Sequence, residues 1–409
     1  MEYLLDHEIE EKEKFSEKNL ILLGTSLDTG KTVYMKHNPK SERTIISGAT
    51  GRGKTNIAKL IISQKIKFFA ERYRKKFLIL DYKGIDWRTI QKPQENIKAL
   101  HPNLLPFAIK NVKVYTPAYD ETIAFPGDKL FSFCPTDFDY EDWLQGGKFM
   151  AIGADELENM RETSPEIFES PTRLIETIGE SAPNYLESMK RGGSDFINSN
   201  TKRVLIRTLR ILRKKRILVS EKSSLRANYT ILDDLKGMTI PVLQMGETGG
   251  KYVQFYSGKI LRQVFNARHR EIKDKKHKLG YINVVIEEAP VIFHKGVDIV
   301  DNPAAYSIAR IFKRGRTFGI SIDLITQTIE ELHAVSWKNA DKFIISAGCS
   351  DDDKKILRGL GVDECYLERL NELRFEPEYG RYEFMYIGND KKGIVFNAAL
   401  TPVGTTEEV

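Results

Sequence analysis

The sequence predicts an α/β protein whose sheet is mostly parallel. Short apolar runs that end in polar residues recur along the chain, as buried strands of parallel sheets do, and helical patterns separate many of them. The expected strands are 44–47, 77–81, 112–115, 240–244, 282–287, 320–326 and 343–346. Strands that alternate with helices form mostly parallel sheets, whose ligands bind beyond the carboxyl ends of the strands. The polar residues after these strands are therefore the first candidates for a functional site.

The first of these strands leads into a complete phosphate-binding loop, GATGRGKT, at residues 48–55. Glycines let such a loop curl so that its N–H groups point at an anion. Lys54 would reach the β- and γ-phosphates, and the Thr55 hydroxyl would ligate Mg²⁺. Helical spacing follows from 56 to 69, which puts the phosphates at a positive helix N-terminus. The expected nucleotide-binding residues are Gly48, Ala49, Thr50, Gly51, Arg52, Gly53, Lys54, Thr55 and Asn56, with ATP and Mg²⁺ as cofactors.

A similar stretch upstream, GTSLDTGKT at 24–32, is not a second phosphate loop. Its first glycine lies one residue too far upstream for the motif. Residues 28–31 lie between the apolar segments 21–23 and 33–35, which predicts a hairpin turn.

An acidic pair follows the expected strand 282–287 and supplies the second half of the site. Glu287 would hold Mg²⁺ through water, and Glu288 would polarise the water that attacks the γ-phosphate. Glu287 stands where Asp is commoner, but its longer side chain still reaches a water-bridged metal. The alternative is a solvated acidic turn.

Three more polar residues near strand ends are candidates. Gln327 follows the strand 320–326 and could hydrogen-bond the γ-phosphate or the lytic water. Arg314 and Arg316 lie just upstream, and a guanidinium offers several donors to a phosphoryl group in transition. In ring ATPases such an arginine often comes from the neighbouring subunit. The alternative for both arginines is a helix end that cations stabilise before Gly315 or Gly319.

Composition limits the classes of protein. The chain has 409 residues, of which 41% are hydrophobic and 29% charged, as in soluble globular proteins. Its three cysteines, Cys134, Cys349 and Cys365, are far apart and odd in number, which predicts a cytoplasmic protein with no disulfide framework or zinc spacing. We expect no membrane span and no signal peptide. The net charge of +6 is compatible with many partners.

A densely cationic helix is expected at 203–214. Arg203, Arg207 and Arg210 fall on one helical face, and Leu205, Leu209 and Leu212 fall on another. Such a helix can bury its leucines and offer its arginines to DNA phosphates without reading sequence. The alternative is a solvated helix whose cations only cover apolar surface. A second candidate contact, 251–255, is either a pore loop or the start of a helix.

The domain boundaries follow from these patterns. A small β-rich segment is expected at 1–40, the first part of an ATPase core at 41–136, a helical insertion at 137–236, the second part of the core at 237–400, and a tail at 401–409 that frays after Pro402. Acidic helical segments at 165–178 and 182–190 characterise the insertion.

The chain resembles the HerA/FtsK superfamily of P-loop ATPases, and most closely its HerA-type branch. The matching segments are 22–30, 46–55, 81–84, 114–117, 287–289, 315–319 and 324–327, in the order of the family. The resemblance implies a RecA-like core, a homo-oligomer in the form of a hexameric ring, and ATP-driven movement of double-stranded DNA through its pore. A nuclease or another DNA-processing protein is a candidate partner. Glu287 departs from the Asp that is usual in the family, and the leader before the phosphate loop is shorter than that of cellular HerA helicases.

Three functions therefore compete. The first is an ATP-hydrolysing DNA translocase or helicase. The second is a conjugation- or secretion-type ATPase that moves protein or nucleoprotein substrates. The third is a nucleotide-gated scaffold with weak hydrolysis, in which Glu287 has slowed turnover.

Overall fold

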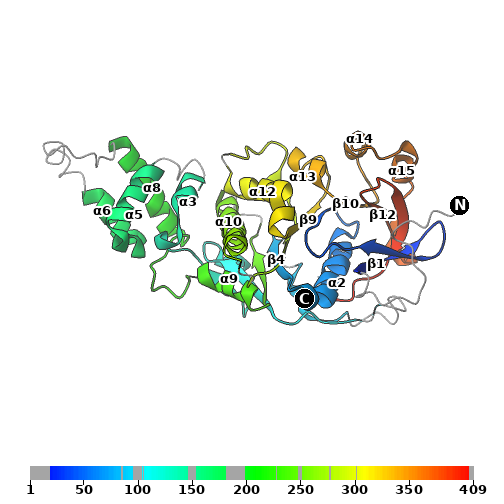
Figure 1. The fold of residues 1–409 in the computed structure, drawn as a ribbon, viewed down its shortest axis with the longest axis horizontal. Coiled ribbons are helices and arrows are strands. Elements are labelled where there is room, and N and C mark those ends of the chain that lie inside the picture. Colours follow the sequence, from blue (N-terminus) through cyan, green and yellow to red (C-terminus); the bar gives the residue numbers. More distant parts are fainter. Residues whose placement is uncertain are drawn as a thin grey trace.

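The computed structural model describes residues 19–83, 86–94, 104, 106–145, 153–180, 199–226, 228–246, 251–275, 278–300 and 302–404. In these ranges the strands form one sheet in the order β2-β1-β13-β12-β10-β3-β9-β8-β4-β7-β5-β6, with β11 paired to β12 (Figure 1). The strands are β1 Leu20–Ser26, β2 Thr32–Lys36, β3 Arg43–Ser47, β4 Lys76–Asp81, β5 Val112–Pro117, β6 Lys129–Phe131, β7 Ile240–Gln244, β8 Ile282–Ile286, β9 Ile320–Thr326, β10 Lys342–Ser346, β11 Phe375–Glu376, β12 Arg381–Ile387 and β13 Gly393–Ala398.

The prediction of a mostly parallel sheet is confirmed. Every neighbouring pair from β10 through β3, β9, β8, β4, β7 and β5 to β6 is parallel. All seven predicted strands are present, as β3, β4, β5, β7, β8, β9 and β10. The antiparallel strands β12 and β13 were not predicted, although the aromatic and β-branched residues of 381–387 and the turn after it are typical of a hairpin.

Helices cover both faces of the sheet. On one face α2 (Lys54–Tyr73) packs against β1, β3, β4 and β9; on the other, α10 (Lys251–Lys273) packs along α12 (Pro303–Phe318). Alternate strand residues enter separate cores: Ile45 lies in one and Ile46 in the other. The shorter helices are α11 Pro290–Phe293, α13 Ala334–Asn339, α14 Asp351–Gly359 and α15 Glu364–Arg369.

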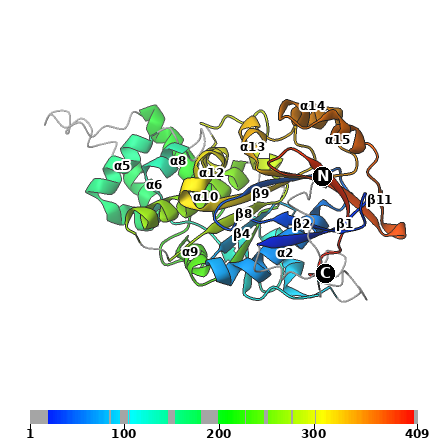
Figure 2. The ribbon, with the colours of Figure 1, turned by 45° about the vertical axis from the view of Figure 1, so that its right-hand side comes forward.

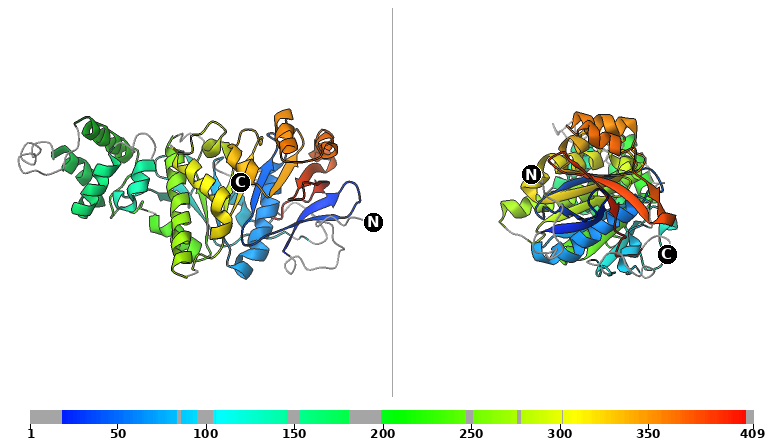
Figure 3. Two further views of the ribbon diagram at one scale, coloured as in Figure 1. Left: turned by 45° about the horizontal axis from the view of Figure 1, so that its top comes forward. Right: turned by 90° about the vertical axis from the view of Figure 1, so that its right-hand side faces the viewer.

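The segment between β6 and β7 is helical. It contains η3 Pro135–Asp137, α3 Tyr140–Gln145, α5 Ala154–Thr163, η4 Pro165–Glu169, α6 Pro171–Glu180, α8 Ser199–Lys214 and α9 Asn228–Lys236. Helices α5, α6 and α8 form one end of the molecule, away from α2 (Figures 1 and 3). Helix α9 instead packs against β4 and β7. The predicted helical segment 182–190 lies outside the described residues.

The two ends of the described chain lie against the sheet rather than apart from it. Strands β1 and β2 form the predicted hairpin (Figure 2). Strand β1 also pairs antiparallel with β13. The prediction that the tail frays after Pro402 is wrong for Val403 and Gly404, whose backbones pair with Pro93 and Lys92. Val403 is fully buried, and its backbone forms a β-bridge with that of Pro93. Burial of its apolar side chain stabilises this ordered position and offsets the conformational entropy that the chain loses.

A network of buried charges lies between α2 and the amino ends of the parallel strands. The Nζ atom of Lys65 lies 2.7 Å from Asp323 Oδ1 and 3.2 Å from Glu42 Oε2. Glu42 also pairs with Lys342 and accepts a hydrogen bond from the His37 ring over 2.8 Å. Because all these side chains are almost fully buried, each charge depends on its partners.

Candidate nucleotide site

The phosphate loop joins the end of β3 to the start of α2, as predicted. Gly51 and Gly53 have φ values of 74° and 76°, which residues with side chains rarely adopt. A Cβ at Gly48 would lie only 1.7 Å from the Ser346 hydroxyl oxygen at the end of β10, so this position admits no side chain without displacement. The backbone curl and the close packing both therefore depend on glycine.

Lys54 is the first residue of α2 and its side chain is nearly buried. Burial lowers the pKa of Lys54; the charge of Glu288 opposes this shift and that of Lys83 adds to it. The negative charge of a bound phosphate would oppose the effect of burial and favour the protonated form of Lys54.

The loop and the acidic strand end meet directly. The Thr55 hydroxyl donates a hydrogen bond to Glu287 Oε1 over 3.1 Å, and the indole N–H of Trp87 donates to Glu287 Oε2 over 3.2 Å. Glu287 is fully buried where it follows β8. The two residues that the sequence assigned to the metal are therefore neighbours, although 232 residues separate them.

A lysine lies among the carboxylates of the site. Lys83 Nζ is 3.3 Å from Glu287 Oε1, 3.2 Å from Glu288 Oε1 and 3.7 Å from Asp86 Oδ2. Burial raises the pKa of Glu287 to about 7, against the opposing charge of Lys83; Asp81 and Asp86 add to the rise. The charges of Glu287 and Glu288 outweigh burial and raise the pKa of Lys83.

Glu288 has an unusual backbone. Its φ is +48°, in the left-handed region that residues with a Cβ seldom occupy. The next residue, Ala289, donates its N–H to the Ile325 carbonyl oxygen of β9 over 2.9 Å, which fixes the turn. Strained backbone of this kind concentrates at functional sites.

Gln327 follows β9, the strand between the phosphate-loop strand β3 and the strand β8 that leads into this turn. The Thr50 hydroxyl donates to Gln327 Oε1 over 3.1 Å. The structure therefore gathers Lys54, Thr55, Glu287, Glu288 and Gln327 at the carboxyl ends of β3, β8 and β9.

The donor set fits Mg²⁺ bound together with a nucleotide. Within the described ranges no three His, Cys, Asp or Glu side chains enclose a metal by themselves. Mg²⁺ commonly takes one or two protein oxygens together with water and substrate phosphates. The Thr55 hydroxyl and the Glu287 carboxylate are such a pair, and the Lys83 ammonium already occupies this acidic position as a cation.

Arg314 and Arg316 do not lie beside the phosphate loop. They belong to the last turns of α12, which ends at the amino end of β9 before Gly319 (φ +66°). The Arg316 guanidinium donates to Asp341 Oδ1 over 2.6 Å, and Arg43 binds the same carboxylate. A parallel strand of five to seven residues spans roughly 15–20 Å, so neither arginine joins the phosphate loop of its own chain.

The cationic helix has the predicted faces. Leu205, Leu209 and Leu212 are buried in α8, whereas Arg203, Arg207 and Arg210 are exposed. The three arginines, with Ile206 and Ile211, line an open hollow of about 470 Å³. Residues 251–255 begin α10, with Val253 and Phe255 buried, so the helix alternative holds there and the pore-loop alternative is wrong.

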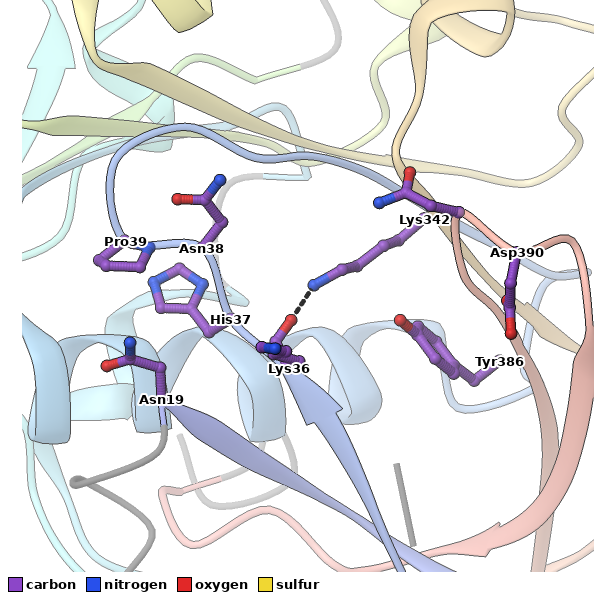
Figure 4. A pocket seen from close by; sticks show the side chains of 9 residues that line it. Asn19, Lys36, His37, Asn38, Pro39, Lys342, Tyr386 and Asp390 are labelled. Atoms are coloured by element: carbon purple, nitrogen blue, oxygen red, sulfur yellow. Dashed lines mark hydrogen bonds between the residues drawn. The ribbon is translucent and has the colours of Figure 1, made fainter. Parts of the chain in front are cut away.

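A further pocket of about 390 Å³ lies at the amino ends of the strands (Figure 4). Its lining includes His37, Lys342, whose ammonium binds the Lys36 carbonyl oxygen, and the rim residues Asn38 and Asp390. No predicted site residue is among the described residues that line it. This edge of the sheet is opposite to the one that carries the phosphate loop.

Sequence reasoning did not assign roles to Lys83, Asp86 and Trp87. The acid and base of Asp81 and Lys83, directly after a predicted strand, were the available signal. Asp81 itself organises the turn, because its carboxylate accepts the N–H groups of Lys83 and Trp87 over 3.1 and 3.2 Å. Nothing in the local pattern marks Trp87.

Comparisons with known proteins identify the family of the chain. The family described as "Helicase HerA, central domain" matches residues 21–264, more than half of the chain. The chain is 26% identical over 171 residues to "Probable helicase MJECL08" of Methanocaldococcus jannaschii; this covers 40% of the chain but only 32% of that relative.

Two solved structures share the fold. One is the bacterial conjugative coupling protein TrwBdeltaN70, with a TM-score of 0.54 and 11% identity, over 91% of this chain and 88% of that one. The other is VirB4 of Thermoanaerobacter pseudethanolicus, with a TM-score of 0.54 and 12% identity, over 93% and 96%. Among the described helices, none combines the length and the apolar character that crossing a bilayer requires. The chain therefore belongs to the family of HerA helicase central domains, within the HerA/FtsK superfamily of P-loop ATPases.

Proposed function

We propose that this protein hydrolyses ATP and uses the energy to move double-stranded DNA through a ring of its own subunits. The hydrogen bond between Thr55 and Glu287 carries the catalytic part of the proposal. It joins the phosphate loop to an acidic strand end, and a P-loop ATPase needs both. The longer Glu287 side chain, in place of the usual Asp, still contacts the threonine.

Each residue of the site has a role in this reaction. Lys54 would neutralise charge on the β- and γ-phosphates, and Thr55 and Glu287 are the residues that would hold Mg²⁺. Bound Mg²⁺ supplies charge stabilisation to the phosphates. Glu288 orients and polarises the attacking water, and Gln327 hydrogen-bonds the γ-phosphate or that water. The loop backbone from Gly48 to Thr55, with Asn56, holds the remaining phosphate oxygens.

The exposed arginines of α8 support DNA as the substrate. Arg203, Arg207 and Arg210 present their guanidinium groups on one face while the opposite face is buried. Cations that contact phosphates bind DNA of any sequence, as a motor that travels along DNA requires. The alternative, a helix whose cations are only solvated, does not account for three arginines that line one hollow.

In a ring of subunits, Arg314 and Arg316 would act on the nucleotide of a neighbouring subunit. Both lie at the sheet edge opposite to the phosphate loop of their own chain, and Arg316 is 67% exposed. In a closed head-to-tail ring, most simply a hexamer, this edge can face the nucleotide of the next subunit. We place this motor in the cytoplasm, where a nuclease or another DNA-processing protein is a candidate partner.

Hydrolysis with and without duplex DNA tests the proposal. We expect DNA to stimulate turnover in the wild type, and the Lys54→Ala variant to be inactive although folded. Wild-type hydrolysis in Lys54→Ala would refute the site. Hydrolysis that a protein substrate stimulates and DNA does not would favour a conjugation- or secretion-type ATPase. ATP binding without turnover would favour a nucleotide-gated scaffold.

A further inference from the structure

The phosphate loop has two different flanks. On the β9 side lie the hydrolytic candidates Glu288 and Gln327. On the β10 and β12 side lies an aromatic ring, that of Phe375, the first residue of β11. A Cβ at Gly53 would be 2.7 Å from Phe375 Cε2 and 3.3 Å from its Cζ, so the edge of this ring rests on the backbone of the loop.

The ring of Phe375 is fixed by its neighbours. β11 pairs with β12, with Phe375 opposite Tyr382, and the two rings meet edge to face with centroids 5.6 Å apart. Phe384, two residues further along β12, is buried and also reaches the position of a Gly53 Cβ, at 3.6 Å. Phe375 is only partly buried. One part of the ring is therefore held by packing, and the rest is open beside an anion-binding loop.

The direction in which a bound nucleotide lies along the loop follows from the residues on its two flanks. The γ-phosphate must lie beside the carboxylate that activates water, which is on the β9 side of the loop. The triphosphate runs along the loop, so the nucleoside leaves on the opposite flank, where Phe375 lies.

We propose that Phe375 is the platform on which the base of the nucleotide stacks. This inference rests on the proposed ATP site and adds the recognition of the base to it. Stacking on an aromatic face tolerates any base because every base has a π-face. The platform therefore binds ATP and GTP with similar affinity, and selects nucleotides against inorganic polyphosphates.

The difference between the affinities for ATP and for inorganic tripolyphosphate measures what the nucleoside contributes to binding. Dissociation constants for both, with Mg²⁺, are measured by calorimetry on the full chain. Phe375→Ala and Phe375→Leu should bind ATP roughly tenfold more weakly, as loss of one stacked base implies, and should bind tripolyphosphate as the wild type does. Phe375→Trp should keep the affinity for ATP. Tyr379→Ala, on the same hairpin but 74% exposed, is the matched control and should change neither constant.

The outcomes separate this inference from the proposed function. An equal loss for ATP and tripolyphosphate in Phe375→Leu means that the ring only supports the loop, and overturns the platform. Unchanged ATP affinity in Phe375→Ala also overturns it. In both cases a wild type that hydrolyses ATP leaves the proposed function standing. A wild type that binds neither ligand removes both proposals, and thermal unfolding of each variant shows that it is folded.

Discussion

The ammonium group of Lys83 lies 3.3 Å from the Glu287 carboxylate, and so places a cation on the fully buried acid that the phosphate loop contacts. The same ammonium is 3.2 Å from Glu288. The Lys83 side chain thus contacts both members of the acidic pair. In the proposed ATP site, Mg²⁺ would be a second cation beside these carboxylates, so Lys83 and the metal would compete for them.

Replacing Lys83 with Met should therefore make the protein sensitive to Mg²⁺ alone. Without Lys83, the buried Glu287 loses its ion pair and keeps only the charge of Lys54 against Glu288 and Asp86, so we expect a loss of about 1–3 kcal/mol in the free energy of unfolding. Millimolar Mg²⁺ should restore part of this loss, because a ligand of the native state stabilises it. Urea unfolding with and without Mg²⁺ measures both effects. Lys355→Met, at an exposed ion pair, is the control, and an equal Mg²⁺ response in the two variants would contradict the prediction.

Glu288→Gln should bind ATP but turn it over about 10²- to 10⁴-fold more slowly, because the amide keeps the shape and cannot polarise water. Glu287→Gln should instead weaken the Mg²⁺-dependent part of nucleotide binding. Turnover assays and binding of a fluorescent ATP analogue, each with and without Mg²⁺, distinguish the two. If Glu287→Gln traps ATP and Glu288→Gln loses metal dependence, the roles are exchanged.

Mixed rings test the arginines at the end of α12. Subunits with Arg316→Ala and subunits with Lys54→Ala should each be inactive alone. A mixture should regain part of the ATPase activity, because an intact phosphate loop in one subunit then meets an intact arginine from its neighbour. The same mixture with Arg314→Ala identifies which arginine acts. A monomer with full activity in the presence of ATP and DNA excludes action between subunits.

The triple variant Arg203→Gln, Arg207→Gln and Arg210→Gln should bind every duplex sequence more weakly. Each lost phosphate contact should also reduce the slope of log affinity against log salt by about one. Fluorescence anisotropy between roughly 50 and 200 mM salt measures this. Basal ATP hydrolysis should survive, since α8 lies at the far end of the molecule from α2 (Figure 1).

The control for this helix removes three exposed cations elsewhere, Lys355, Arg358 and Arg381, and so changes the net charge equally. If both triple variants lose the same affinity, the effect is one of overall charge and α8 is no specific contact.

Acid should destabilise the protein through Glu42. Burial alone would raise its pKa, but the charges of Lys342, Lys65 and His37 hold it well below its usual value. Because the folded pKa lies below the unfolded one, the stabilisation is present above about pH 4.3 and is lost as pH falls through the folded pKa.

Glu42→Gln should lose about 3–5 kcal/mol at neutral pH, because the buried Lys342 loses its carboxylate partner and Lys65 is left with Asp323 alone. It should also show a flatter decline in stability between about pH 5 and 3. Urea midpoints across this range measure the decline. Glu364→Gln, at an exposed pair, should keep the wild-type acid dependence. An unchanged slope in Glu42→Gln would mean that other carboxylates govern acid unfolding.

The parallel core was predictable because its strands are buried on both faces and appear as continuous apolar runs, such as 282–286. The strands β12 and β13 pair antiparallel and are each buried over only four consecutive residues, so only their aromatic content and turn marked them. In the site, the roles of Lys54 and Thr55 were predictable because both belong to a local phosphate-binding motif with a defined spacing. Trp87 and Phe375 were missed because each reaches the site through the fold, from a segment whose own sequence carries no phosphate-binding pattern.

The position of β3 between β9 and β10 has a consequence for biosynthesis. Thr44 pairs in register with Asp323 on one side and with Lys342 on the other, so both neighbours of the phosphate-loop strand are made by the ribosome almost 300 residues after it. Until then β3 has two unpaired edges, and unpaired edges invite association with other chains. The emerging chain also lacks Glu287 and Gln327 until β8 and β9 have been made. The phosphate loop of a nascent chain therefore stays without its acidic and amide neighbours for more than 200 residues of synthesis.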